Sequence, residues 1–319
     1  MKTGFTRLTS LITITLSLSL LLITGNVGAV GGGSGYKVSP VRTDLIINRG
    51  TYKNTKIYVK NVSSVKEYIQ TIVNDFTASK NESGTPTLIL NEKTPYRHGL
   101  KQFVTIKNPK FILTPGQQET VNVDINIPKY AAPGGYYGAI RFAPASLNSN
   151  QKSVNLSASV ATLVLVKVPG NYYENMTLSG FNVEQNGNLG SLFYNNKNIQ
   201  ANVSFTNEGE VQEEPFGKIL LTKAGKQIYS YPINTATPPG NVLPNSTRKF
   251  TVDVSHVGIF GKYTLMGNFG YGSKGQLLSA TTTFYVIPIY LIVIVAIILL
   301  LIILVILLLI RKKRHSVNK

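Results

Sequence analysis

Apolar and polar residues alternate along most of the chain between residues 36 and 286, and almost no segment has the spacing of an amphipathic helix. Residues 55–61 alternate strictly, so Ile57 and Val59 fall on one face of a strand, and residues 121–127 repeat the pattern. Further strands are predicted at residues 43–48, 68–76, 103–106, 137–142 and 154–168. Short runs rich in Val, Ile, Thr, Tyr and Phe, separated by Gly, Pro, Asn and Ser, are typical of antiparallel β-sandwiches. The sequence therefore predicts an all-β fold.

The second half of this region repeats the first weakly. Nine residues lead from Pro115 to Asp124 and nine from Pro244 to Asp253, and each copy continues into a strand led by glycine. A strand that ends in asparagine before a small polar turn also occurs twice, at Asn61 and Asn207. These repeats predict two tandem immunoglobulin-like β-sandwiches, residues 36–170 and 171–286, that meet at a proline–glycine pair.

The two ends of the chain predict export and anchoring. Residues 1–29 have a basic start, an apolar run and a small-residue exit at Ala29, which is the pattern of a cleaved signal peptide. A glycine-rich spacer follows at residues 30–35. An N-terminal membrane anchor is the alternative interpretation of the same apolar run.

Near the other end, residues 287–310 contain no charge, and 24 residues of helix, at about 1.5 Å per residue, are long enough to cross a bilayer. The tail, residues 311–319, carries five Lys and Arg and no acid, which predicts a cytoplasmic C-terminus and an outside N-terminus. The sequence thus predicts a single-pass plasma membrane protein whose β-rich part lies outside the cell. Because an exported region of this length without cysteine is unusual for an animal surface protein, we expect a bacterial envelope.

Charge is distributed unevenly along this exported region. Residues 36–170 contain 17 Lys and Arg against seven Asp and Glu, a net charge of +10, whereas residues 171–286 contain eight against seven. A basic exported module attracts anionic polymers, so we expect a cell-wall polymer or peptidoglycan as its ligand and no nucleic acid. An ordinary solvated surface is the alternative interpretation.

The candidate polymer-binding residues are cationic or aromatic side chains that we expect to be exposed. They lie on the outward face of the strand at residues 55–61 and just before it, in the irregular region at residues 91–110, and beside a proline–glycine turn. They are Lys53, Lys56, Tyr58, Lys60, Arg97, Lys101, Lys107, Lys110, Tyr136 and Tyr137.

Residues for catalysis or metal binding do not stand out. The chain has no cysteine, which excludes disulfides, thiol nucleophiles and cysteine-bound metals, and its three histidines are far apart. The glycine-rich segment at residues 270–275 lies between two predicted strands and is therefore a hairpin loop rather than a phosphate site. We expect a protein that is not an enzyme and holds no cofactor or metal.

Several motifs of the first module resemble the peptidoglycan-binding domain of WxL-interacting surface proteins. They are Tyr36-Lys37-Val38-Ser39-Pro40, Val59-Lys60-Asn61, Leu113-Thr114-Pro115-Gly116-Gln117 and Pro133-Gly134-Gly135-Tyr136-Tyr137-Gly138. The second module with its following span is similar to the companion host-binding domain. The resemblance implies a non-enzymatic surface anchor that binds wall glycan with its first module and holds a partner, such as a WxL-type surface protein, with its second.

Two other functions remain open. The first is a membrane-tethered assembly chaperone or scaffold that captures a partner by β-strand addition, for which a long sheet edge without Lys or Pro would be evidence. The second is a hydrolase, which would need a cleft with converging carboxylates.

Overall fold

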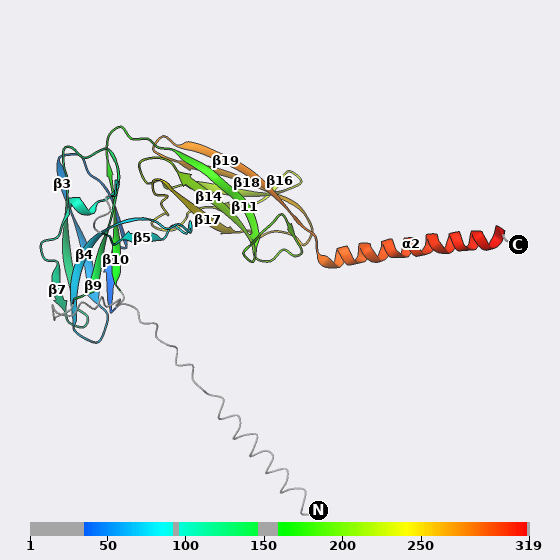
Figure 1. Ribbon diagram of the computed structural model, residues 1–319, viewed down its shortest axis with the longest axis horizontal. Helices are drawn as coiled ribbons and strands as arrows, with labels where there is room; N and C mark the ends of the chain where they lie inside the picture. Colours follow the sequence, from blue (N-terminus) through cyan, green and yellow to red (C-terminus); the bar gives the residue numbers. More distant parts are fainter. Residues whose placement is uncertain (1–34, 92–95, 146–158, 318–319) are drawn as a thin grey trace, which may run out of the picture.

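The computed structural model describes residues 35–91, 96–145 and 159–317, and its β-strands form four sheets that are followed by one helix (Figure 1). The predicted signal peptide, most of the glycine-rich spacer and the last two residues of the tail lie outside the described residues. Within them the fold is all-β with a single long C-terminal helix.

Strands β1 to β10 form two sheets. In the first, the order is β1 (Tyr36–Ser39), β3 (Thr51–Asn61), β8 (Gln118–Ile127) and β6 (Val104–Thr105). In the second, the order is β2 (Arg42–Ile46), β10 (Val160–Val168), β9 (Gly134–Pro144), β4 (Glu67–Ala78) and β5 (Pro86–Ile89), with β7 (Lys110–Leu113) also on β4. We refer to these two sheets as the first module.

Strands β11 to β19 form the second module. Its third sheet has the order β12 (Asn188–Leu189), β11 (Met176–Gln185), β14 (Ile199–Asn207) and β17 (Ser246–Asp253). Its fourth sheet has the order β13 (Leu192–Phe193), β19 (Gln276–Val286), β18 (Gly261–Tyr271), β15 (Phe216–Lys223) and β16 (Lys226–Pro232).

The two modules share one topology, which gives the sequence repeat its structural basis. In each, the chain starts antiparallel to a strand of one sheet, β3 or β14, and crosses to run parallel to a strand of the other, β10 or β19. Strands β9 and β18 both begin at a glycine, Gly134 and Gly261, with a φ of 135°. An L-residue with a side chain rarely adopts this backbone conformation, so glycine is required where the chain enters these strands.

Each module encloses an apolar core between its two sheets. Ile57 and Val59 are fully buried, as the alternation of β3 predicts, and they pack with residues of β8, β9 and β10. The core of the second module is built in the same way, and it includes Phe205, Tyr263 and Phe284. Burying each such side chain contributes about 1.5–3 kcal/mol, which makes these cores the main source of stability.

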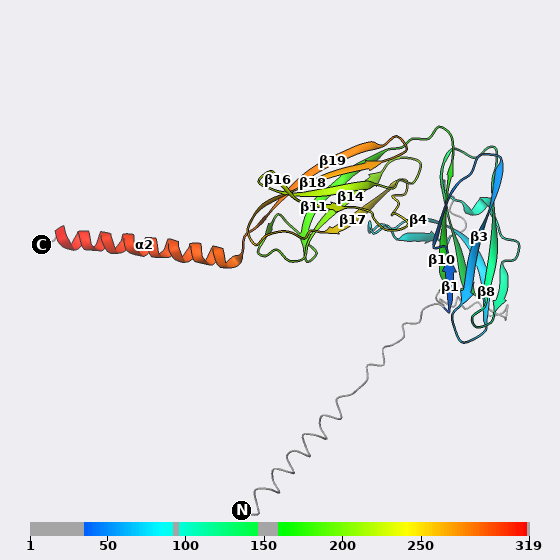
Figure 2. The same ribbon diagram turned by 180° about the vertical axis from the view of Figure 1, so that it is seen from behind.

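The C-terminal helix α2 (Ile289–Val317) begins three residues after β19 and leads away from the second module (Figures 1 and 2). Its apolar stretch from Ile289 to Arg311 is long and hydrophobic enough to be a candidate membrane span, and its side chains are exposed. Pro288 precedes the helix, where its missing N–H costs no hydrogen bond. The predicted start at residue 287 is therefore early by two residues.

Two strand predictions differ from the structure. Residues 103–106 were expected to form one strand, but the 3-10 helix η2 (Lys101–Phe103) occupies the start of that segment and β6 has only two residues. The long strand expected at residues 154–168 is described only from residue 159 onward, where β10 begins at Val160.

Candidate functional site

Most edge strands of the described sheets carry the residues that natural proteins use to prevent pairing with another chain. Strand β1 contains Lys37 and is followed by Pro40, and β16 contains Lys226 and ends in Pro232. Strand β17 carries Arg248 and Lys249, and the Lys249 N–H donates to Glu82 O of the first module at 2.8 Å. Charge, proline and cover by another segment all disfavour the addition of a further strand.

Strand β19 is the exception. It lies near the edge of the fourth sheet, but the short β13 pairs only with its last two residues, Tyr285 and Val286. Its outer side is therefore free of strand partners from Gln276 to Thr283. None of its eleven residues is charged and none is proline. Among the described residues, the outer side of β11 is also open and uncharged from Met176 to Val183, but a bulge between Leu178 and Gly180 interrupts that strand, whereas β19 is regular over its whole length.

The backbone groups on this open side follow from the register. Tyr285 N donates to Ser191 O at 2.7 Å, so the amide of residue 285 points away from β18. The pairing of β18 with β19 has no bulge over its eleven residue pairs, and backbone groups alternate sides along a strand. The N–H and C=O groups on the open side therefore belong to Leu277, Ser279, Thr281 and Thr283.

Side chains along the same strand alternate between the core and solvent. Phe284 is fully buried, whereas Leu277 is 83% exposed at the opposite end. Strand β11 of the third sheet runs next to β19. A strand added in the plane of the fourth sheet would thus meet an uncharged backbone ladder with an exposed leucine at its start. We call residues 276–283 of β19 the open edge.

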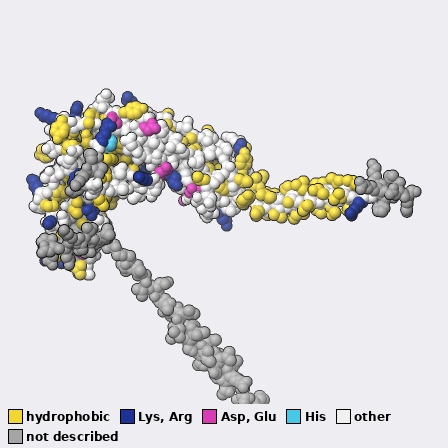
Figure 3. Space-filling model, in the orientation of Figure 1, with side chains coloured by type: hydrophobic (Ala, Val, Ile, Leu, Met, Phe, Trp, Pro, Cys, Tyr) yellow, Lys and Arg dark blue, Asp and Glu magenta, His cyan; other side chains and the backbone are white. Residues whose placement is uncertain are grey.

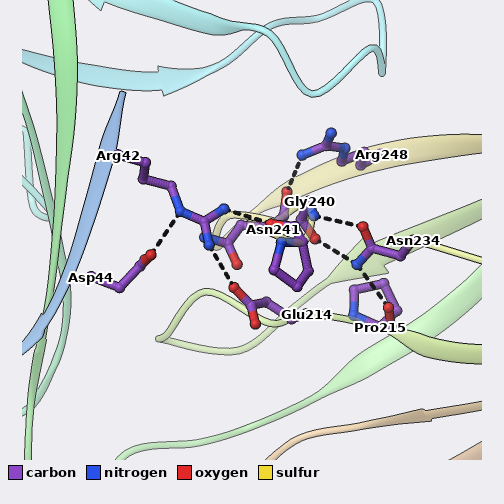
Figure 4. A network of polar contacts seen from close by, with 9 residues as sticks. Arg42, Asp44, Glu214, Pro215, Asn234, Gly240, Asn241 and Arg248 are labelled. Carbon is purple, nitrogen blue, oxygen red and sulfur yellow. Dashed lines mark hydrogen bonds and ion pairs between the residues drawn. The ribbon is translucent and has the colours of Figure 1, made fainter. Parts of the chain in front are cut away.

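The junction between the modules forms a second candidate site (Figure 4). The Arg42 guanidinium on β2 donates to Asp44 Oδ2 at 2.7 Å, to Glu214 Oε1 at 2.9 Å and to Pro239 O at 2.6 Å. Since Glu214 and Pro239 belong to the second module, one side chain joins both modules.

A cleft of about 620 Å³ lies beside this junction. Its walls include Arg42, Asp44 and Lys167 from the first module and Glu213 and Glu214 from the second. The opening is charged on both sides, which suits a polar or ionic ligand better than an apolar one.

Two buried titratable groups in the first module have structural partners. Burial raises the pKa of Asp75, whose Oδ1 accepts from Lys101 N at 2.7 Å. Burial lowers the pKa of His98, whose Nδ1 lies 2.8 Å from Gly135 O. No group of three or more His, Cys, Asp or Glu is arranged for a metal ion among the described residues. Through these contacts Asp75 and His98 hold loops of the first module in place.

The predicted polymer-binding residues on β3 come together only in part. Lys56, Tyr58 and Lys60 are exposed on the outer face of the first sheet, as the alternation predicts. Lys53 is exposed too, but it lies three residues before Lys56, so its side chain belongs to the opposite face of the strand. Lys107 and Lys110 are exposed in and after the loop that lies beside β8, the neighbour of β3.

The remaining predicted residues lie elsewhere. Arg97 is exposed, but it forms an ion pair with Glu210 of the second module at 2.6 Å. Lys101 lies in η2 and is half-buried. Tyr136 and Tyr137 were expected to be exposed, which is wrong: both are buried on β9, because all of its residues from Gly134 to Ile140 are enclosed between the sheets and the junction.

Sequence reasoning missed the residues that now stand out. The open edge had a signal, an uncharged run of eleven residues between a glycine loop and the apolar span. Glu213 had no such signal in the sequence, because it is one of four glutamates between residues 208 and 214. Its burial depends on the packing of segments that are distant in sequence.

Comparison with known proteins gives likenesses of fold at low identity. No family model matches the chain, and no curated protein matches it. Among solved structures, the chain is similar to a chaperone–tip adhesin complex of CFA/I fimbriae, with 14% identity, a TM-score of 0.37, and coverage of 79% of this chain and 99% of the other. It is also similar to the CupB2 chaperone of Pseudomonas aeruginosa, with 9% identity, a TM-score of 0.34, and coverage of 77% and 98%. For the CsuC–CsuE chaperone–tip adhesion subunit complex of Acinetobacter baumannii these values are 12%, 0.35, 76% and 97%.

These findings correct the resemblance to WxL-interacting surface proteins, which is wrong. No model of that family matches, and the similar solved structures are fimbrial chaperones and their complexes. The expected function as an anchor that binds a cell-wall polymer or peptidoglycan is wrong on the same finding, and so is the expected WxL-type partner. Of the candidate residues, Tyr136 and Tyr137 are buried and Arg97 is paired with Glu210, so these three do not extend the exposed group on β3.

Proposed function

We propose that this chain is a membrane-tethered, non-enzymatic assembly chaperone or scaffold that captures a strand of a partner protein at the open edge of β19. The observation that carries this proposal is the unpaired edge itself, eight residues without charge or proline. In strand addition, main-chain hydrogen bonds supply affinity and alternate side chains supply specificity.

The geometry of the open edge defines the kind of partner. Four N–H and four C=O groups, on Leu277, Ser279, Thr281 and Thr283, are available to an extended segment of about eight residues, or about 26 Å. Because the edge is uncharged and Leu277 is exposed, we expect an uncharged strand with an apolar residue near that position.

The same proposal includes an arrangement of the whole chain. Residues 36–170 and 171–286 are two immunoglobulin-like domains outside the cell, α2 crosses the plasma membrane once, and the basic tail is cytoplasmic. Support comes from the loops at the helix end of the second module. Ile259 and Phe260 are exposed just before Gly261, which pairs with Val286, and Ile287 N donates to Phe193 O. Exposed apolar side chains beside a membrane-spanning helix are suited to the lipid interface.

A proline substitution tests strand capture at the level of single amides. Thr281→Pro removes an N–H that points to the open side and leaves the ladder with β18 intact, so the fold should persist. The probe is a fluorescein-labelled ten-residue peptide of alternating Thr and Val, added to the full chain in detergent. We expect binding by fluorescence anisotropy, weakened at least about tenfold by Thr281→Pro and less than about threefold by Thr281→Ala.

Hydrogen exchange of the same samples locates the peptide. The amides of Ser279 and Thr281 should exchange quickly in the free chain and become protected when the peptide binds, whereas Ala280 and Thr282 should be slow in both. Fast exchange that the peptide leaves unchanged, or equal affinity of Thr281→Pro and Thr281→Ala, would show that β19 does not capture strands.

A further inference from the structure

Three buried side-chain oxygens without a hydrogen-bond partner gather around the turn between β18 and β19. They are Glu174 Oε1, Glu213 Oε1 and Gln276 Oε1, and each is closed off from solvent. An unsatisfied buried oxygen costs about 1–3 kcal/mol, and a charged one costs more, so three of them in one place need a physical reason.

Three segments of the second module bring these side chains together. Glu174 precedes β11, Gln276 begins β19, and Glu213 lies between β14 and β15, where its backbone exchanges two hydrogen bonds with Val242 at 3.0 and 2.8 Å. All three groups surround Gly272 in the turn. A methyl group on Gly272 would lie 2.5 Å from Gln276 Oε1 and 3.2 Å from Glu174 Oε2, so only glycine leaves room for them.

The turn fixes the orientation of both carboxylates. Gly272 N donates to Glu213 Oε2 at 3.1 Å, and Ser273 donates to Glu174 Oε2 through N at 3.0 Å and through Oγ at 2.7 Å. Each carboxylate therefore accepts hydrogen bonds from the turn with one oxygen, and its other oxygen has no hydrogen-bond partner. The free oxygens belong to groups close enough that Glu174 raises the pKa of Glu213.

The charge of this cluster is not compensated by an ion pair. Glu213 is only 3% exposed, and within the described residues no Lys or Arg lies within 4 Å of either carboxylate. The charge of Lys167, whose ammonium lies 5.9 Å from the centre of the Tyr172 ring, lowers the pKa of Glu213 but does not outweigh its burial. Two like charges at a buried site repel each other unless a cation joins them.

We propose that Glu174, Glu213 and Gln276 bind a small hard cation of the Ca²⁺ class. The site offers only oxygen ligands, two from carboxylates and one from a neutral amide, which is the ligand type that Ca²⁺ prefers, and it has none of the nitrogen or sulfur ligands that Zn²⁺ and Cu²⁺ favour. A proton shared between the two glutamates would satisfy the carboxylates but would leave Gln276 Oε1 without a partner. A cation held between the three groups would give all three oxygens a partner.

The number of charged ligands sets the expected affinity. Two carboxylates and one amide resemble the weak sites of extracellular modules, so a dissociation constant of about 10⁻⁴ to 10⁻³ M is expected. The cation would fix the turn at which the open edge begins and would connect it to the loop that carries Glu213 and Glu214 at the junction cleft. The site is independent of strand capture and can be tested without a peptide.

Catalysis by the same carboxylate pair does not fit the geometry. Their free oxygens are buried, so a molecule with a scissile bond cannot reach them, whereas a single ion needs far less room. A general acid and base must reach the reacting atoms within hydrogen-bond distance.

Terbium luminescence tests the site directly. The chain has 17 tyrosines and no tryptophan, and Tyr172 lies two residues before Glu174, so it can sensitise a bound Tb³⁺ ion. We expect the full chain in detergent, after removal of metals with a chelator, to gain Tb³⁺ luminescence that Ca²⁺ displaces. Glu213→Gln and Glu174→Gln should weaken the binding of both ions at least about tenfold.

Two variants keep the test decisive. Glu184→Gln, at the far end of β11, is the matched control and should bind as the parent does. Gln276→Leu removes the neutral ligand without changing charge, and it serves if the glutamate variants do not fold. Luminescence that is absent, that Ca²⁺ does not displace, or that is unchanged in Glu213→Gln and Gln276→Leu would overturn the proposal. Loss of peptide binding in Thr281→Pro has no bearing on it.

Discussion

Two buried asparagines hold equivalent corners of the two modules. Asn61 Nδ2 donates to Val65 O and Leu113 O, and its Oδ1 accepts from Ser63 N. Asn207 Nδ2 donates to Val211 O and Val242 O, and its Oδ1 accepts from Gly209 N. Each side chain ties the turn after its strand to the loop before β8 or β17. The repeated asparagine in the sequence therefore marks a repeated hydrogen-bond cluster.

Replacing one of these asparagines should destabilise its module strongly. Asn207→Ala leaves the Val211 carbonyl and the buried Gly209 N–H without these partners and removes one of the two bonds to Val242 O, so we expect a loss of about 3 kcal/mol in the free energy of unfolding. Urea denaturation of the full chain in detergent measures it. Asn54→Ala on β3 is the control. It removes an exposed hydrogen bond to Asp124 of β8 and should cost less than about 0.5 kcal/mol. Equal losses in the two variants would contradict this role of Asn207.

Glu213 should make stability depend on pH in an unusual direction. Burial and the nearby Glu174 raise its pKa from 4.5 to about 7, so the folded chain binds a proton more tightly than the unfolded chain. Between about pH 4.5 and pH 7 the contribution of Glu213 to stability therefore falls as pH rises, and it is constant outside that window. The total change is on the order of 3 kcal/mol.

Thermal unfolding in the presence of a chelator checks this dependence. The parent chain should lose stability from pH 4.5 to pH 7, and Glu213→Gln should reduce this slope because glutamine has no proton to release. Glu214→Gln changes an exposed neighbour and should keep the slope of the parent. If Glu213→Gln has the same slope as the parent, the pKa of Glu213 is not raised in the folded chain.

At the scale of strands, alternation alone located most strands of the first module. β3, β4, β8 and β9 lie where the pattern predicts them, because one face of each sheet meets an apolar core and the other meets water. The alternation could not show which strands pair. The edge position of β19, and the burial of Tyr136 and Tyr137 on both sides of β9, depend on neighbours far away in sequence. The resemblance to a wall-binding family failed for a related reason, since its motifs were strand and turn patterns that many sandwiches share.

The pairing of β15 with β18 depends on a glycine that the alternation does not mark. Gly217 has a φ of 134°, and a methyl group there would overlap Asn268 O of β18. Gly217→Ala should therefore cost more than about 3 kcal/mol or prevent folding of the second module, since strain and overlap add. Gly187→Ala separates the two effects. Its φ is 80° but nothing lies within 4 Å, so only strain of about 1 kcal/mol is expected. Urea midpoints that are the same for both variants would contradict the overlap argument.

At the scale of the whole molecule, the modules contact each other through polar bonds around a small apolar cluster. Phe76, Tyr137 and Leu165 of the first module pack with Leu243 of the second. The hairpin between β4 and β5 reaches across to β17 (Figure 1), and the space-filling view in Figure 3 shows both modules as one continuous surface. Interfaces between domains that are this polar usually allow motion unless specific contacts restrain it. The mutual orientation of the modules therefore depends on a few residues.

Arg42 is the residue that should control this orientation. Its side chain is only 11% exposed, and it donates to groups of both modules, so solvent and salt screen its bonds less than those of a surface pair. Because the chain has no cysteine, spin labels can be introduced at Lys56→Cys on β3 and Lys226→Cys on β16, both exposed sites in different modules. Distances between the two spin labels, measured by pulsed electron double resonance, should have a narrow distribution in the parent and a broad one in Arg42→Ala. Arg49→Ala, an exposed arginine in the turn between β2 and β3, should leave the distribution narrow. A narrow distribution in Arg42→Ala would mean that the apolar cluster around Leu243 is sufficient to fix the two modules.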